Sequence, residues 1–158
     1  MIFVDTSVLV DYLRGKSTPA VEMLANLDAN SVPYAIPFLC CQEILQGARD
    51  EREWRLLREN LSTQRLALPA DPAALHWEAA RIFFDCRRRG LTVRGSVDCL
   101  IAAQAIEAAA TLLHDDEDYE RIKKVRPGLR TERGFPVTRT VRGLDTELVL
   151  VPATRRDP

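Results

Sequence analysis

Short extended runs alternate with helical segments along most of this chain, and this order constrains the fold more than any other feature of the sequence. The runs are β-branched or apolar, and they cover residues 2–4, 31–36, 65–68 and 111–114. Because helical segments separate each run from the next, the strands are expected to be joined by helical crossovers and to pair in parallel. The sequence therefore predicts an α/β fold with a central, mostly parallel sheet that helices cover on both faces.

Capping residues and prolines locate the helices between these runs. Thr18 precedes Pro19 and Asp71 precedes Pro72, and each pair places a capping side chain before a proline in the first helical turn. Ser96 is expected to cap a central, Ala-rich helix. The predicted helices cover residues 8–14, 20–27, 37–48, 49–61, 72–89 and 97–109, with a short helix or helical turn within 115–124.

The charge balance excludes one class of nucleic-acid binder. The 158 residues, enough for one domain, include 22 Lys and Arg against 23 Asp and Glu, so the formal net charge is −1. A polybasic protein that binds nucleic acid through bulk charge is excluded, although a local basic path is not. Aromatic residues make up only 6% of the chain, which disfavours an aromatic stacking platform for single-stranded nucleic acid.

The cysteines and the first residues indicate a cytoplasmic protein. Cys40, Cys41, Cys86 and Cys99 form no C-x-x-C pair, and with only two histidines a transition-metal centre is not expected. We expect the thiols to pack as small core side chains in a reducing compartment. An acid interrupts the first apolar run early, and no run approaches the ~20 apolar residues of a membrane span, so neither a signal peptide nor a membrane partner is expected.

Four acidic residues occupy special positions in the predicted fold. Asp5 follows the first strand, Asp116 follows the fourth, Asp98 lies in the first turn of a helix, and Glu43 lies on the helix that begins at Pro37. Ligands of open α/β sheets bind at the carboxyl ends of the strands. Each acid alone also has a structural explanation, as a helix cap, a first-turn acid or part of a solvated face. Together they predict a carboxylate site for Mg²⁺, or alternatively Mn²⁺, which suits hydrolysis of a phosphodiester.

Three segments carry a resemblance to a known family. In order and spacing they resemble the PIN-domain ribonucleases, specifically the VapC toxins of bacterial VapBC toxin–antitoxin pairs: MIFVDTSVLVDYLRG, QEILQGA and SVDCLIAAQAIEAAATLLHDDEDYERI. The resemblance implies a three-layer α/β/α domain over residues 1–126 with a Mg²⁺-dependent acidic site that cuts RNA. It makes Asp5, Glu43 and Asp98 the three near-invariant acids. Asp116 matches the fourth, and Asp118 is the alternative because the acidic run leaves the alignment loose.

The same resemblance implies a role and partners. Asp5 and Asp98 would hold the metal directly or through water, while Glu43 and Asp116 would complete the site and orient or deprotonate the attacking water. The implied substrate is structured cellular RNA such as tRNA or rRNA, cut to leave a 3′-hydroxyl and a 5′-phosphate. A VapB-type antitoxin would cover the acidic site, and the toxin would form a homodimer.

Two alternatives to an active nuclease stay open. One is a non-catalytic PIN-like binding module, and the other is a toxin inactivated by its altered C-terminus, because the extension of residues 127–158 has no counterpart in the family pattern. This segment includes the apolar run 148–151 and is predicted to add one edge strand or hairpin. A phosphatase with an Asp nucleophile is disfavoured, since such enzymes need a second Asp where this chain has Ser7.

Two basic features near the acids are candidates for phosphate contacts. Arg87, Arg88 and Arg89 end a predicted helix, where the helix dipole favours cations, so a structural explanation competes with RNA contact. Arg94 lies just before the next helix and is the stronger candidate. His114, directly before the acidic run, is expected to be structural rather than a general base.

Overall fold

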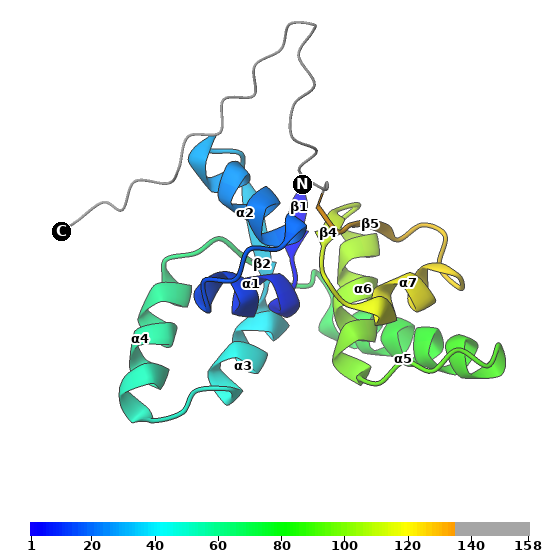
Figure 1. Cartoon of the computed structure of the whole chain (residues 1–158). Helices are drawn as coiled ribbons and strands as arrows, with labels where there is room; N and C mark the ends of the chain where they lie inside the picture. The colour runs from blue at the N-terminus through cyan, green and yellow to red at the C-terminus, as the bar shows by residue number, and fades with distance from the viewer. Residues whose placement is uncertain (135–158) are drawn as a thin grey trace, which may run out of the picture.

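Five parallel strands form the sheet of this protein, whose computed structural model describes residues 1–134 (Figure 1). Their bounds are Ile2–Val4 for β1, Tyr34–Pro37 for β2, Leu66–Ala67 for β3, Thr111–Leu113 for β4 and Arg130–Glu132 for β5. The strands lie in the order β3-β2-β1-β4-β5, and every neighbouring pair is parallel. The predicted α/β fold with a parallel sheet is confirmed.

Helices cover the sheet on both sides. Figure 1 shows α1 to α4 on one side of the strands and α5 to α7 on the other, which gives three layers. Their bounds are Thr6–Leu13 for α1, Pro19–Ala29 for α2, Phe38–Gln46 for α3, Glu51–Ser62 for α4, Pro72–Arg88 for α5, Ser96–Glu107 for α6 and Glu117–Lys123 for α7. All seven predicted helical segments are present, with ends that differ by a few residues.

Local capping signals determine where several of these helices begin. The Thr18 side chain accepts a hydrogen bond from the Val21 N–H at 3.2 Å and starts α2. Asp71 accepts bonds from Ala73 and Ala74 and starts α5, so both predicted caps are confirmed. These bonds satisfy backbone donors that the first helical turn leaves without partners.

The predicted cap at Ser96 is wrong, because Gly95 is the N-cap of α6 and Ser96 is its first helical residue. A Cβ atom on Gly95 would lie 2.8 Å from Asp98 Oδ2, which is closer than such atoms approach. The Asp98 carboxylate therefore takes the space that a capping side chain would need, and glycine leaves that space open.

The order of the strands creates a crevice in the middle of the sheet. From β1 the chain moves outward through β2 and β3, then returns to the other side of β1 for β4 and β5. Ligand sites of open parallel sheets form at such a switch point, outside the carboxyl ends of the strands. Here the switch point lies between the ends of β1 and β4, directly before Asp5 and His114.

A single apolar core joins both helical layers to the sheet. Helix α6 is central, as its composition predicted, and it buries Ile101, Ala102 and Ala105 completely. All four cysteines are free and buried, which confirms them as core side chains. Over residues 1–134, no helix combines the length and apolar character needed to cross a membrane.

Strand β5 lies beyond residue 126, so the sheet continues into the segment that the sequence set apart as an extension. It pairs in parallel with β4, and the preceding Leu129 is buried in the core. Gly134 closes the segment at φ +78°, where a Cβ atom would lie 2.1 Å from the Pro19 carbonyl oxygen. This close approach to the start of α2 requires glycine. The apolar run 148–151 lies outside the described residues.

The contribution of β5 is testable by comparing two truncated chains, one ending at Gly134 and one ending at Gly128. The shorter chain loses the β4–β5 pairing and the buried Leu129 side chain. We expect its free energy of unfolding to be about 2–4 kcal/mol lower, since burial of one leucine contributes about 1.5–3 kcal/mol. Urea denaturation followed by circular dichroism measures the difference. Equal denaturation midpoints would show that β5 does not contribute to stability.

Candidate functional site

Asp5 lies at the switch point of the sheet and is fixed from three directions. Its backbone N–H donates to the Leu113 carbonyl at 3.0 Å, which ties the end of β1 to the end of β4. One carboxylate oxygen accepts the Ser7 N–H at 2.9 Å and the Ser7 hydroxyl at 2.6 Å, so Asp5 also caps α1. The other oxygen accepts the Tyr119 hydroxyl at 2.6 Å. With only 4% of Asp5 exposed, these bonds set the direction of its carboxylate.

Tyr119 is a site residue that the sequence did not predict. It is fully buried on α7, and burial together with the nearby Asp5 charge raises the pKa of its hydroxyl well above the usual range. The hydroxyl therefore stays protonated and acts as a fixed donor to Asp5. Its position after the acidic run gave no signal of this contact, because the two residues are 114 positions apart.

Thr6 connects Asp5 to Glu43 on the neighbouring helix. The Thr6 hydroxyl donates to Glu43 Oε2 at 2.6 Å, so the first residue of α1 orients a carboxylate of α3. Burial raises the pKa of Glu43, the bond from Thr6 opposes that change, and the Asp5 charge adds to it. The Thr6 bond therefore holds Glu43 close enough to Asp5 for the two charges to interact.

Asp98 is where the negative charge of the site concentrates. Its pKa is raised to about 7, most strongly by burial and then by the charges of four other carboxylates, in the order Asp5, Asp116, Asp118 and Glu43. An acid in the first turn of a helix is ordinarily stabilised by the helix dipole, so this shift opposes the local preference. The structure thus brings all four predicted acids into one electrostatic site, together with Asp118.

The fourth acid is held by Arg94 from the loop before α6. Asp116 caps α7 and accepts two bonds from Arg94 Nη2, at 2.6 and 2.8 Å. Asp118 is fully buried and accepts the Arg94 N–H at 2.9 Å, Arg94 Nε at 3.0 Å and a bond from Arg121. Burial alone would raise the pKa of Asp118, but these bonds lower it overall. Asp118 therefore serves to fix Arg94, while Asp116 is the more exposed of the two.

Arg133, directly after β5, pairs with two other acids of the run. Arg133 donates to Asp115 at 2.9 Å and also to Glu117. Neither of these two acids is among the charges that raise the pKa of Asp98. The sequence gave no reason to select Arg133, because it lies in the predicted extension. Arg133 therefore neutralises the two acids on either side of Asp116 in the sequence.

Two other candidates have structural roles. His114 is fully buried beside Tyr119, with ring centroids 4.9 Å apart, and burial lowers its pKa, so it remains neutral as a packing residue. Burial raises the pKa of Cys99 to about 12, which keeps its thiol protonated. Both side chains are buried in the core beside the site.

The donor set suits a hard divalent cation. The acids around Asp98 offer only oxygen atoms, and their mutual repulsion would be relieved by positive charge. Among residues 1–134, no group of three or more His, Cys, Asp or Glu side chains is arranged so that it could hold a metal ion. Mg²⁺ does not need such a cluster, since it usually keeps several waters and binds one or two carboxylates. The residues present therefore fit Mg²⁺ held by two acids.

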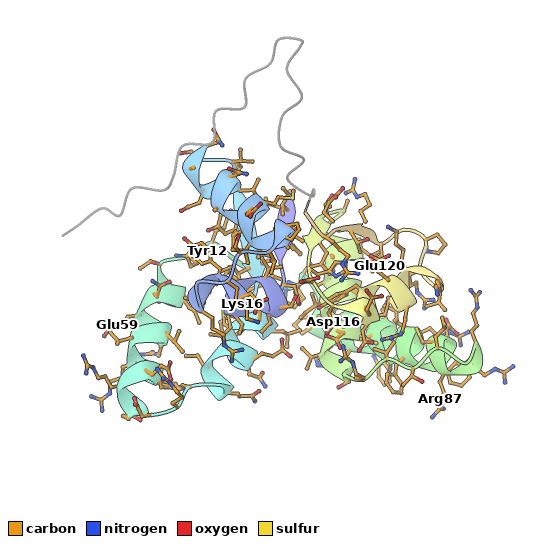
Figure 2. The ribbon with its side chains drawn as sticks, viewed as in Figure 1. Tyr12, Lys16, Glu59, Arg87, Asp116 and Glu120 are labelled. Carbon is orange, nitrogen blue, oxygen red and sulfur yellow. The ribbon has the colours of Figure 1, made fainter. Side chains whose placement is uncertain are left out.

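Figure 2 places Asp116 near the middle of the molecule, between the two groups of helices. Asp116 lies there beside α7 and the loop before α6. A hollow of about 700 Å³ opens there, lined by Gly90, Leu91, Thr92, Arg94, Asp115, Asp116, Glu117, Arg121 and Lys124.

Comparisons with known proteins agree on one family. The model of the PIN domain matches residues 2–125. VapC ribonuclease Mb1587 of Mycobacterium bovis and Ribonuclease VapC11 of Mycobacterium tuberculosis are each 38% identical to this chain over 126 residues, which are 79% of this chain and 93% of each relative.

Solved structures agree on the fold. VapBC2 from Rickettsia felis, bound to a DNA fragment from its promoter, has a TM-score of 0.64 at 21% identity and covers 84% of this chain and 98% of its own. FitAcB from Neisseria gonorrhoeae has a TM-score of 0.58 at 18% identity and covers 83% of this chain and 96% of its own. At these identities the similarity shows the fold alone.

The charge concentration at Asp98 predicts a pH dependence of stability. Its pKa is about 7 in the folded protein and about 4 in the unfolded chain, so the folded state binds the extra proton and stability falls as the pH rises from 4 to 7. We expect Asp98→Asn to remove this fall. Allowing for solvent screening, the variant should gain roughly 1–3 kcal/mol at pH 8 and nothing at pH 4.

Urea denaturation at the two pH values measures this difference. Asp28→Asn, which changes an exposed acid on α2, is the matched control and should show no such gain. A gain of equal size at pH 4 and pH 8 would contradict the assigned cause.

Proposed function

This chain belongs to the VapC family of PIN-domain ribonucleases, and from that premise we propose that it is a Mg²⁺-dependent endoribonuclease toxin whose site is Asp5, Glu43, Asp98 and Asp116. The observation that carries the proposal is the coupling of Asp98 to the other three carboxylates at the switch point of the sheet. Such a concentration of buried and half-buried acids costs stability unless a cation offsets it, so a purely structural role does not account for it.

Asp5 and Asp98 are the residues that would hold the metal. Asp5 is aimed by Ser7 and Tyr119, and Asp98 is the acid on which the repulsion of the others acts most strongly. A bound Mg²⁺ or Mn²⁺ supplies activation of water and neutralisation of charge on the phosphoryl oxygens. The buried donors around Asp5 hold its carboxylate in place before any ion or substrate arrives.

Glu43 and Asp116 complete the site in different ways. Burial raises the pKa of Glu43, and Thr6 occupies one of its oxygens, which leaves the other to orient the attacking water and accept its proton. Arg94 holds Asp116 at the mouth of the site, where the same guanidinium can meet a phosphate. Attack by water on the phosphorus would leave a 3′-hydroxyl and a 5′-phosphate.

The substrate that fits this role is structured cellular RNA, with tRNA and rRNA as the classes to test. Cutting either one stops translation, which is the effect expected of a toxin. The cytoplasm, where these RNAs are found, is the proposed location.

Cleavage of total RNA tests the proposal directly. We expect the purified chain to cut RNA with Mg²⁺ or Mn²⁺ and to stop when EDTA is added. Asp5→Asn and Asp98→Asn should each reduce the cleavage rate by about 100-fold or more, because each removes one carboxylate from the metal. Adaptor ligation to the products detects the expected 5′-phosphate.

Asp28→Asn serves again as the control and should cut at the wild-type rate. Cleavage that persists in EDTA would contradict the metal mechanism. A folded wild-type chain that cuts no RNA would favour the non-catalytic binding module or the inactivated toxin instead.

An apolar groove between α3 and α4 supports an antitoxin as the protein partner. The groove has a volume of about 570 Å³, and its apolar lining includes Phe38, Leu45, Trp54 and Leu66. Phe38 is 53% exposed although it begins the helix that carries Glu43. An apolar segment of a VapB-type antitoxin would cover this surface and end near the acidic site, where a basic side chain could pair with the carboxylates.

The groove makes a separate prediction about this partner. Phe38→Asp should weaken binding of the antitoxin encoded beside this chain by about tenfold or more, because it places a charge in the apolar contact. Leu56→Asp, an equally exposed change on α4 outside the groove lining, is the control. Isothermal titration calorimetry measures both. Equal weakening by the two variants would contradict binding of the antitoxin in this groove.

A further inference from the structure

An exposed face of α5 combines aromatic and cationic side chains. Trp77, Arg81, Phe84 and Arg88 follow one another at helical spacing on this face, and Arg87 lies beside them. Trp77 is 77% exposed and Phe84 is 40% exposed. The guanidinium carbons of Arg81, Arg87 and Arg88 lie 5.3, 6.0 and 6.0 Å from the centre of the Phe84 ring. We call these five residues the Phe84 patch.

The charges of the Phe84 patch are only partly balanced. Arg81 pairs with Asp85, which also receives a bond from Arg126. Arg87 and Arg88 have no ion pair with any residue in 1–134. The helix dipole favours cations at this end of α5, which explains the arginines. It does not explain why two large aromatic side chains are exposed beside them.

The patch continues into the hollow that leads to the acidic site. Arg89 follows the patch and donates to the Lys124 carbonyl at 2.8 Å, which fixes the end of α5 against α7. The lining of this hollow includes Gly90, next to Arg89, the cations Lys124, Arg121 and Arg94, and the site acid Asp116. Figure 2 shows Arg87 at the outer end of α5 and Asp116 at the inner end of this route. Cations thus lie between the exposed Phe84 ring and Asp116.

We propose that the Phe84 patch and Lys124 bind a single strand of the RNA substrate and guide it through this hollow to the acidic site. Arg87, Arg88 and Lys124 would pair with successive phosphates, and a base would stack on the Phe84 ring. This inference rests on the proposed ribonuclease function. It adds a surface that binds the RNA away from the phosphodiester that is cut.

The chemistry favours RNA over two other occupants of this face. A second copy of the chain, packed patch against patch about a two-fold axis, would bring arginines against arginines. An acidic peptide would pair with the arginines but would meet Asp115, Asp116 and Glu117 further along the hollow. An RNA strand matches both parts, because its phosphates suit the arginines and its phosphodiester is what the acidic site acts on.

Binding of labelled RNA to the full-length chain tests the proposal. All variants carry Asp98→Asn to prevent cleavage, and the probe is a fluorescent, unstructured 20-nucleotide RNA followed by anisotropy at several NaCl concentrations. Arg87→Gln with Arg88→Gln should weaken binding about tenfold at 0.1 M salt and reduce the slope of log affinity against log salt by about 1 to 2. Phe84→Leu should weaken binding about fivefold with the slope unchanged.

The matched control is Arg52→Gln with Arg58→Gln on α4. It removes the same charge and the same kind of contact, since the Arg58 guanidinium lies 5.9 Å from the Trp54 ring centre. The control should bind RNA as the parent does. Equal affinity and salt slope for the α5 and α4 variants would overturn the proposal, as would a loss of affinity that accompanies a change in oligomeric state by analytical ultracentrifugation.

Cleavage by the wild-type active site separates this inference from the proposed function. If the chain cuts RNA in Mg²⁺ and the α5 variants, with Asp98 intact, cut it equally well at limiting RNA concentration, the nuclease function stands and this binding surface is wrong. If the folded wild-type chain neither binds nor cuts RNA, the proposed function fails and this inference fails with it.

Discussion

The buried hydrogen bond from Tyr119 to Asp5 is the interaction on which the rest of the site depends. It joins the first strand–helix junction to α7, two parts of the chain that meet only because β4 returns beside β1. The backbone bond from Asp5 to Leu113 closes the same junction from within the sheet. Since both oxygens of Asp5 are bonded to protein donors, its carboxylate cannot turn away when other acids approach.

The remaining acids are arranged by a balance of repulsion and pairing. Arg94 and Arg121 compensate for Asp118, and Arg133 compensates for Asp115 and Glu117. No cation is among the causes of the Asp98 pKa shift, and both burial and the neighbouring carboxylates raise this pKa. The fold therefore neutralises the acids that position the loop and leaves Asp98 without a cationic partner, which costs stability and would serve the proposed metal site.

Local signals predicted most of the fold, and long-range contacts account for what the sequence missed. Thr18 and Asp71 were predictable because a cap acts within three residues of itself. The predicted cap at Ser96 was wrong because the N-cap is set by the contact between the Gly95 position and the Asp98 carboxylate, which depends on side-chain direction. Asp5 and Asp116 were predictable from strand ends, whereas Tyr119 and Arg133 become site residues only through pairing across the finished sheet.

A net charge of −1 conceals two regions of opposite sign. The crevice collects acids that internal donors hold, while the outer end of α5 exposes arginines around an aromatic ring. Neither region alone suits a phosphodiester: the acids without a cation would repel it, and the arginines without the acids would bind it without reaction. Because Arg94 touches Asp116 and lines the hollow between the two regions, it is the point at which binding of phosphate and orientation of the acidic site meet. The proposed surface agrees with the low aromatic content of the chain, because it needs one exposed ring among cations and no extended stacking platform.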